Sequence, residues 1–414
     1  MKLHRIGFGS LWFLLWACQG PYADPIGVSD AGFLGGVAGR GGNAGAGGQV
    51  AIGGSGGTGG GGVVDGGGDD AGDATPSSAG GTSSMSAAEP DGGTAADTAG
   101  ITDGAAAVDT TTSTPIPAQP TDVCGYPFTR KVMVNNPTTL RAALADARAG
   151  DMIQLAPSNY IGRFTITHSG TKTAPIVICG PRNAVLDGGT GGYTLYLDGT
   201  DWIVVSGIKI ANGLKGVVLE AADDNLLSQI EISDSLQQGV LIRSESSRNT
   251  VIESYVHDTG LRDPGLGDGI YVGSGGGGDA SDYNKLINNR VYNTAAECID
   301  IKEGTKGGVV VGNMLDGAGM KGGTDADSLI DASGNGYMIE KNQGSNPRRH
   351  GFEVHSVGGA SSSGRSNVFR ENTLAVKSSD AVGIYVESAA IDNVVACSNI
   401  VTGGLGRCNR PCDN

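Results

Sequence analysis

Short apolar runs recur along the chain from about residue 202 onward. One set follows the pattern of WIVVSGIKI and begins at Trp202, Asn225, Asn249, Asn284, Gly308, Gly336, Ser366 and Asp392. A second set, typified by GVLIRS and GIYVGS, lies between them and begins at Gly216, Gly239, Gly269, Cys298, Leu329, Gly351 and Gly383. Two alternating strand types cannot bury a core in one repeat, but stacked repeats can. The pattern predicts an all-β fold, a parallel β-helix of about nine to eleven coils with two strands in each coil.

Two further features agree with stacked coils. Before the repeats, TTLRAALADARAGD has the apolar spacing of an amphipathic helix that ends at Gly150. Because a solenoid must cover its open end, we predict that this helix caps the N-terminal end. Asparagines also recur at one position of the repeat, where each can hydrogen-bond the next in a ladder: Asn289, Asn313, Asn342, Asn372 and Asn399.

The first residues have the pattern of an export signal. Lys2 and Arg5 precede an apolar stretch that ends in LLWAC. LWAC resembles the lipobox of bacterial lipoproteins, which implies that residues 1–17 are a signal peptide and that Cys18 is lipidated. In Gram-negative lipoproteins, the absence of Asp after the Cys favours the outer membrane, and Gln19 stands there. We expect an extracytoplasmic protein, lipid-anchored to the outer membrane or cell surface, with plain secretion as the alternative.

Mass spectrometry of the protein from its native membrane tests the lipid anchor. The mature chain is expected to begin at Cys18 with a diacylglyceryl group on its sulfur. An unmodified mature chain that begins elsewhere contradicts the prediction.

The segment 18–122 is rich in Gly, Ala, Asp, Ser and Thr. The whole chain has 73 glycines and a formal net charge of −15, and Arg40 is the one basic residue between 19 and 122. Such a segment lacks the apolar surface for a core, so we expect a disordered linker, followed by the β-helix domain at 123–414. The acidic balance argues against a nucleic acid partner. No apolar run reaches the ~18 residues of a membrane-spanning helix, so contact with a membrane is expected only through the lipid, and we expect a monomer.

The chain has seven cysteines, and export favours disulfide bonds. Cys124 and Cys179 are predicted to form a bridge near the N-terminal end of the domain. Cys298 lies within a strand and is expected to be a buried free thiol. At the C-terminal end three cysteines cluster, and we favour a bridge between Cys397 and Cys412, with the state of Cys408 left open.

The alternation of side chains along the second set of strands predicts which residues face outward. Ile299 and Ile301 point inward, so Asp300 points outward, and aligning Ile330 with Ile299 sends Asp331 outward too. One outward column then contains Leu241, Tyr271, Asp300, Asp331, Glu353 and Tyr385. The next contains Arg243, Gly273, Lys302, Ser333, His355 and Glu387. By the same alternation, His350 and His355 are predicted on opposite faces.

Asp300, Asp331 and Glu353 are expected to stack about 4.8 Å apart from coil to coil. Aligned carboxylates repel one another and require a cation, a basic neighbour or a shared proton. Lys302 and His355 stand in the adjacent column. The alternative interpretation is a solvated charged face. A long connection at 260–283 is expected to wall a groove beside these residues.

The segment LRAALADARAGDMIQLAPSNYIGRFTITHSGTKTAPIVICG resembles the opening of secreted right-handed β-helix polysaccharide lyases. Chondroitinase B, its alginate lyase relatives and one family of pectate lyases share this opening. The resemblance covers residues 124–414 and implies a right-handed parallel β-helix. In the chondroitinase B group, a calcium-binding acid precedes the lysine base by five residues, and AECIDIK places Glu297 and Lys302 at that spacing. Asp268 falls one coil earlier, where the group has another calcium ligand.

This chain departs from the chondroitinase B group at two positions. The second acid of the group is replaced by Ala295, and the arginine on the following coil falls near Ala332 or Ser333. Asp300 and Asp331 can supply replacement oxygen ligands. The resemblance implies Asp268 and Glu297 as calcium ligands, and with Asp300 as a replacement we predict a calcium site made by these three residues.

The chemistry that the resemblance implies is calcium-assisted β-elimination of an acidic polysaccharide, a uronate polymer. Lys302 is the expected base, and as an exposed side chain its replacement by alanine is expected to leave the fold intact. The other expected site residues are Asp331, Glu353 and His355 in the catalytic groove, with Tyr271, Arg243 and Tyr385 binding substrate.

Two other functions are compatible with the sequence. A glycoside hydrolase requires a pair of carboxylates, which Asp300, Asp331 and Glu353 can provide. A non-catalytic carbohydrate-binding or adhesin-like surface protein fits the lipid anchor and the long linker. Whether the protein is an enzyme is therefore left open by the sequence.

Overall fold

The structure is a computed structural model that describes residues 124–321, 326–357 and 362–414. The predictions for residues 1–17, for Cys18 and for the linker at 18–122 lie outside the described residues. Within the described ranges, no helix is long and apolar enough to cross a membrane.

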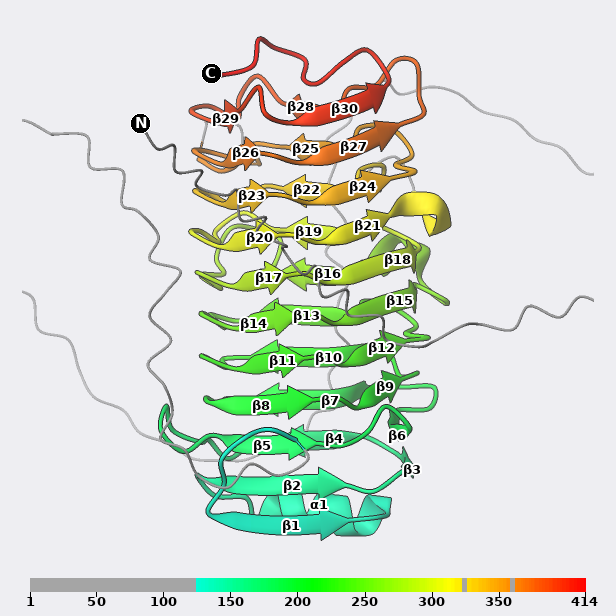
Figure 1. Cartoon of the computed structure of the whole chain (residues 1–414), viewed down its shortest axis with the longest axis vertical. Helices are drawn as coiled ribbons and strands as arrows, with labels where there is room; N and C mark the ends of the chain where they lie inside the picture. The colour runs from blue at the N-terminus through cyan, green and yellow to red at the C-terminus, as the bar shows by residue number, and fades with distance from the viewer. Residues whose placement is uncertain (1–123, 322–325, 358–361) are drawn as a thin grey trace, which may run out of the picture. The chain divides into compact units, whose positions relative to one another are not determined.

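Three parallel sheets run along one column of stacked coils (Figure 1). Nine coils pass through all three sheets, which agrees with the predicted β-helix. The sheet that begins with the first strand, here called sheet A, contains β1 (Arg130–Val134), β2 (Asp151–Leu155), β5 (Ile176–Cys179), β8 (Ile203–Ser206), β11 (Leu226–Ser228), β14 (Thr250–Ile252), β17 (Lys285–Ile287), β20 (Val309–Val311), β23 (Met338–Glu340), β26 (Val368–Arg370) and β29 (Val394–Val395).

The other two sheets complete each coil. Sheet B contains β3 (Ser158–Ile161), β6 (Ala184–Asp187), β9 (Lys209–Ala211), β12 (Glu231–Ser233), β15 (Tyr255–Thr259), β18 (Arg290–Thr294), β21 (Met314–Asp316), β24 (Gln343–Ser345), β27 (Thr373–Val376) and β30 (Ile400–Gly403). Sheet C contains β4 (Phe164–Ile166), β7 (Tyr193–Asp198), β10 (Lys215–Glu220), β13 (Val240–Arg243), β16 (Ile270–Val272), β19 (Ile299–Ile301), β22 (Ile330–Ala332), β25 (Phe352–Val354) and β28 (Ile384–Val386).

Each coil therefore has three strands, and the prediction of two strands was wrong. The first set of apolar runs folds as two strands joined by a sharp bend, as in WIVVSGIKI, where β8 ends at Ser206 and β9 begins at Lys209. Gly207 occupies the bend with φ +79°, a backbone conformation that favours glycine. A bend of this kind keeps apolar residues on the inner side of both strands, so the hydrophobic pattern continues through it.

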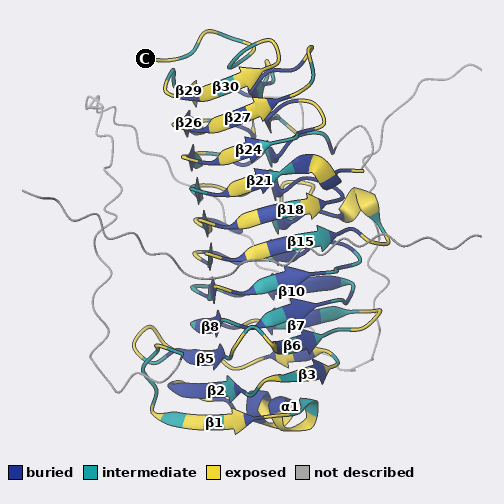
Figure 2. Ribbon diagram, turned by 45° about the vertical axis from the view of Figure 1, so that its right-hand side comes forward, coloured by how far each residue is buried: buried dark blue, intermediate teal, exposed yellow. Residues whose placement is uncertain are grey.

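The core fills the interior of the column. Inward positions on the three sheets, such as Ile232, Val251 and Ile299, are fully buried, and they belong to one continuous cluster. Outward positions on the same strands are more often exposed (Figure 2). This alternation is the hydrophobic pattern of the sequence seen in three dimensions.

The predicted asparagine ladder is present. From Asn289 to Asn399, each side-chain amide donates to the Oδ1 of the next asparagine at 2.9–3.0 Å. Each Nδ2 also donates to a main-chain carbonyl, as Asn342 does to Val310. A second ladder joins Asn225, Asn249 and Asn284. The ladders satisfy polar groups at the buried corners of the coil, where an unpaired amide would be costly.

One α-helix occurs among the described residues, α1 (Pro137–Ala145), with the short 3₁₀ turns η1 (Pro264–Leu266) and η2 (Gly317–Gly319). α1 lies at the N-terminal end of the column (Figure 1), and it buries Leu140, Ala143 and Leu144. It ends at Ala145, before the predicted Gly150, and Asp146 takes the C-cap position with its backbone N–H donating to the carbonyls of Ala142 and Leu144. Its role as a cap stays a prediction.

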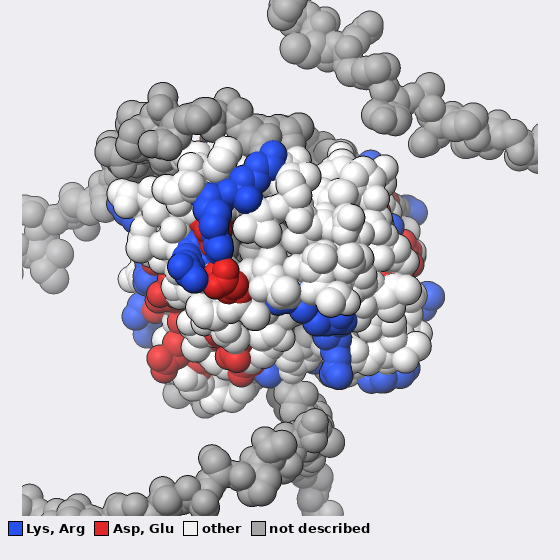
Figure 3. Space-filling model, turned by 90° about the horizontal axis from the view of Figure 1, so that it is seen from below, with Lys and Arg blue, Asp and Glu red and all other residues white. Residues whose placement is uncertain are grey.

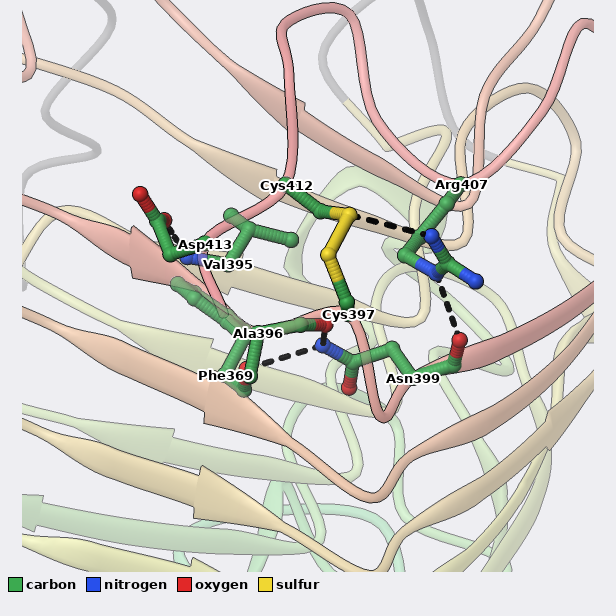
Figure 4. The surroundings of a disulfide bond; sticks show 8 residues. All are labelled: Phe369, Val395, Ala396, Cys397, Asn399, Arg407, Cys412 and Asp413. Atoms are coloured by element: carbon green, nitrogen blue, oxygen red, sulfur yellow. Dashed lines mark hydrogen bonds between the residues drawn. A yellow bond between two sulfur atoms is a disulfide. The ribbon is translucent and has the colours of Figure 1, made fainter.

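Both predicted disulfide bonds are present, between Cys124 and Cys179 and between Cys397 and Cys412. The second bond ties the C-terminal segment to the last coil, and the Arg407 guanidinium beside it donates to the carbonyl of Asn399 (Figure 4). Cys298 is a buried thiol, as predicted, and Cys408 is a partly buried free thiol.

Charge is sparse at the N-terminal end of the described column. Seen from that end, most of the surface is uncharged, and Lys and Arg lie beside Asp and Glu at one side (Figure 3).

Candidate functional site

The outward column predicted on sheet C is confirmed by the strand register. Tyr271 pairs with Asp300, Asp300 with Asp331, and Asp331 with Glu353, while Leu241 and Tyr385 lie at the two ends. The inward neighbours Ile299, Ile330 and Phe352 are fully buried in the core, as the alignment required.

The second column follows just beyond the strand ends. Main-chain bonds continue the ladder there, because Lys302 N donates to Val272 O at 2.8 Å and Ser333 N donates to Ile301 O at 2.8 Å. Gly273 stands beside Lys302 with φ +96°, and a Cβ at Gly273 would lie 2.7 Å from Thr305 Cγ2. The absence of a side chain at Gly273 keeps one side of Lys302 open.

A bend before each sheet C strand brings a third group of side chains to the same face. Cys298 is buried in the core, whereas Glu297 and Asp300 on either side of it gather with Asp268 from the preceding coil. Ligand oxygens of Asp268, Glu297 and Asp300 all lie within 4.8 Å of one another. These are the three residues that the sequence analysis named as calcium ligands.

The carboxylates of Asp268, Glu297 and Asp300, here called the acidic cluster, repel one another. All three residues are at most 5% exposed. Burial, reinforced by the mutual repulsion of the carboxylates, raises the pKa of Asp268 to about 7 and raises the pKa of Glu297. Burial also raises the pKa of Asp300. A divalent cation relieves this repulsion, which is the physical reason that buried carboxylate clusters bind metals.

The donor set fits a hard cation. Carboxylate oxygens are the ligands that calcium prefers, and Oδ1 of Asp300 is buried without a hydrogen-bond partner. Gln238 lies next to Asp268, with its Nε2 3.4 Å from Oδ2 of Asp268, and its Oε1 is also buried without a partner. Gln238 was not predicted from the sequence, because it precedes the bend and no motif spacing marks it.

The side chain of Lys302 is more buried than predicted, and it is held by an ion pair. Its Nζ lies 2.9 Å from Oδ2 of Asp300 and 5.3 Å from the centre of the Tyr271 ring, and its side chain is 26% exposed. Burial alone would lower the pKa of Lys302, but attraction to Asp300 outweighs it and raises the pKa. Removal of the Lys302 side chain is therefore expected to lower the stability of the fold, because Asp300 would then be a buried carboxylate without its cation.

His355 contacts the other two acids of the column, Asp331 and Glu353. Its Nε2 lies 2.8 Å from Oε2 of Glu353 and 3.6 Å from Oδ1 of Asp331. Burial would raise the pKa of Glu353, but the hydrogen bond with His355 lowers it. Burial raises the pKa of Asp331 to about 7. The stacked carboxylates are thus divided between two cations, Lys302 at Asp300 and His355 at Glu353.

His350 belongs to the same site, and its predicted position on the opposite face was wrong. Its Nε2 lies 3.6 Å from Oε1 of Glu353, and its ring stacks on Tyr385 at 4.7 Å. The bend at Gly351 interrupts the alternation on which the prediction rested. Asp327, which the sequence analysis also missed, interacts with Glu353, and burial raises the pKa of Asp327 to about 6.

A pH-dependent contribution to stability is expected from His355. Burial opposes its charge, but Glu353, Asp331 and Glu387 raise the pKa of His355 to about 9. An unfolded histidine titrates near pH ~6.5, so this contribution is fully present below about pH 6.5 and is lost as the pH rises through about 9. His355→Gln should unfold at a lower temperature than the parent protein near pH ~6, and the difference should shrink toward pH ~10 in calorimetry. His168→Gln, at an exposed histidine, is the control. A difference in unfolding temperature between His355→Gln and the parent protein that does not change with pH contradicts the predicted role of His355.

The three residues predicted to bind substrate lie on the face of Lys302 but not all beside it. Tyr271 packs directly under Lys302, whereas Arg243 lies two coils away and pairs with Glu220 at 3.4 Å. Tyr385 lies on the last sheet C strand, where a hollow of about 450 Å³ is lined by Tyr385, Glu387 and Arg410.

A second hollow of about 480 Å³ lies at Ser244, Ser274 and Asp279, next to the Gly-rich loop. The two hollows continue the second column on either side of Lys302 and do not enclose it. From β16 to β28 the column rises four coils, about 19 Å. Its open face suits an extended chain rather than a small molecule.

Comparison with known proteins agrees with this fold. A family model described as "Right handed beta helix region" matches residues 193–323. The structure of an alginate lyase from Paenibacillus sp. str. FPU-7 has a TM-score of 0.63 and 32% sequence identity, and the match covers 68% of this chain and 99% of the lyase. Pectate lyase Pel9A has a TM-score of 0.53 at 18% identity, covering 70% of this chain and 83% of that one, and it supports the fold alone. A comparison with curated protein sequences finds no match.

Proposed function

Because the chain belongs to the right-handed parallel β-helix family with a polysaccharide lyase-like fold, we propose that it cleaves an acidic polysaccharide by calcium-assisted β-elimination. The observation that carries the proposal is the contact of the Asp268–Glu297–Asp300 cluster with Lys302, through the 2.9 Å ion pair to Asp300. The similarity to an alginate lyase at 32% identity supports a uronate polymer as the substrate.

Asp268, Glu297 and Asp300 would hold the calcium ion, with the amide oxygen of Gln238 next to them. Bound there, calcium would offset the negative charge that develops on the uronate carboxylate during elimination. Asp300 would supply an oxygen ligand in place of the acid that the chondroitinase B group has at the position of Ala295.

Elimination needs a base for the proton beside the uronate carboxylate and an acid for the departing glycosidic oxygen. Lys302 is the base in this proposal. It must be neutral to act, and in the structure Asp300 holds it protonated, so it becomes a base only when the charge of Asp300 is compensated. Two groups on the same face carry a proton near neutral pH: the Tyr271 hydroxyl, whose pKa is raised by burial and by Asp300, and His355.

A glycoside hydrolase is the second candidate, and one observation favours it. Asp331, with a pKa of about 7, and Glu353, with a lowered pKa, are paired on neighbouring strands. A protonated acid beside an ionised carboxylate is the arrangement that retaining glycosidases use.

The decisive assay uses the mature full-length protein with alginate, polygalacturonate and glycosaminoglycans. Elimination produces an unsaturated uronate that absorbs in the ultraviolet, and hydrolysis produces reducing ends without that absorbance. We expect the first. Reducing ends without absorbance favour the hydrolase, and retention of a polymer without cleavage favours the carbohydrate-binding or adhesin-like protein.

The location also stays a proposal. The lipobox-like LWAC supports an anchor at Cys18 on the outer membrane or cell surface, or secretion if Cys18 is not modified. An extracytoplasmic location agrees with the two disulfide bonds.

A further inference from the structure

A second group of aromatic and basic side chains lies on sheet B, away from the Lys302 site. We call it the sheet B patch: Arg182, Lys209, Tyr255, Arg290 and Tyr292. Glu231, Tyr255 and Arg290 are register neighbours on β12, β15 and β18, and His257 is the neighbour of Tyr292. Figure 2 shows exposed positions along β15 and β18. None of these residues belongs to the columns of sheet C.

The two tyrosines of the patch are held in defined orientations. The Arg182 guanidinium lies 5.4 Å from the ring centre of Tyr255, and that of Arg290 lies 5.0 Å from the ring centre of Tyr292. Tyr292 also contacts His257, whose ring is stacked on it at 4.7 Å with 9° between the planes. Tyr255 is 42% exposed. Because these side chains are already held in place, they lose little conformational entropy when a ligand binds.

The charge balance around Tyr255 is positive, whereas Asp258 and Asp316 lie beside His257 and Tyr292 at the other side of the patch. Glu231 lies 2.7 Å from Lys209 and 3.2 Å from Arg182, so one carboxylate is shared by two cations. Asp258 pairs with His257 at 2.6 Å. Among the described residues, no carboxylate lies within ion-pair distance of the exposed Arg290. A net positive charge next to the exposed ring of Tyr255 complements an anionic partner.

We propose that the sheet B patch is a second, non-catalytic binding site for an anionic polysaccharide. The ligand class rests on the proposed function, but the site does not share residues with it. The apolar face of a pyranose ring packs on Tyr255, and the guanidinium of Arg290 takes a carboxylate of the same polymer in a charge-assisted, bidentate hydrogen bond. Such a site holds a long polymer on the protein between cleavage events and does nothing for a short oligosaccharide.

The test compares two double variants. Tyr255→Ala with Arg290→Ala removes one ring and the unpaired cation from the patch. Tyr283→Ala with Lys285→Ala is the matched control, because it removes the same residue classes from exposed positions at sheet A. Affinity electrophoresis through gels containing alginate, polygalacturonate or neutral dextran measures binding, and cleavage of short uronate oligosaccharides measures the Lys302 site. Thermal unfolding confirms that both variants are folded.

The patch variant should bind the anionic polymer about tenfold more weakly than the parent protein. The control should bind like the parent, neither should be retarded by dextran, and oligosaccharide cleavage should be equal in all three. Unchanged polymer binding by the folded patch variant overturns the proposal, and so does an equal loss of polymer binding and oligosaccharide cleavage. If no uronate is cleaved but the patch still determines retardation, the proposed function fails and the second site stands.

Discussion

Lys302→Gln is expected to lose β-elimination by about 10²- to 10⁴-fold, the contribution of a general base. Glutamine retains a donor toward Asp300 but cannot accept the proton. The alanine variant is a poorer test, because it leaves a buried carboxylate without its partner and should lower the free energy of unfolding by about 1–3 kcal/mol. Initial rates on the cleaved polymer, followed by ultraviolet absorbance of the unsaturated product, measure the effect.

Two controls separate chemistry from charge and fold. Lys302→Arg keeps the cation beside Asp300 but stays protonated at any working pH, so it should be as inactive as Lys302→Gln. Lys306→Ala, four residues on at a side chain that is 58% exposed, should cleave at the parental rate. If Lys302→Gln catalyses elimination at the parental rate, Lys302 is not the base. Loss of cleavage in Asp331→Asn alone would then favour the hydrolase.

Calcium is expected to raise the midpoint of thermal unfolding by about 5 °C or more at concentrations well above its Kd. A cation that binds the folded acidic cluster stabilises it, and removal of calcium with a chelator should reverse the shift. The measurement is calorimetry or fluorescence-monitored unfolding, which does not depend on finding the substrate. Magnesium should stabilise less, because it requires a tighter octahedral shell than this cluster of carboxylates supplies.

Glu297→Gln should invert the order of stability. In chelator it removes one of three mutually repelling carboxylates, so it should unfold at or above the temperature of the parent protein. In calcium it lacks a ligand and should unfold below the parent. Asp327→Asn, at an acid outside the cluster, should keep the calcium shift. An equal response of the parent and Glu297→Gln to calcium would show that the cluster is not the binding site.

Most of the fold was predictable because a solenoid repeats one local pattern. The alternation in IDI and IYV placed Ile299 and Ile270 inside and Asp300 and Tyr271 outside, and the register of sheet C agrees. The asparagine positions followed from the repeat as well, and the two predicted disulfide bonds, one near each end of the domain, are present. The number of strands per coil did not, because a bend such as that at Gly207 keeps the apolar side inward and leaves the hydrophobic pattern unbroken.

The sequence by itself determined which face of the β-helix carries the candidate site. Period-two alternation and the coil-to-coil register are local rules. They place five side chains on one side of sheet C: Asp300, Asp331, Glu353, Lys302 and His355. What the tertiary structure decided is which of these groups meet. The bends before β19 and β25 turn Glu297 and His350 onto the same face, where alternation alone would have separated them. Burial in the stacked coils then sets the pairing of Lys302 with Asp300 and of His355 with Glu353, because charges removed from water must find a partner within a few ångströms.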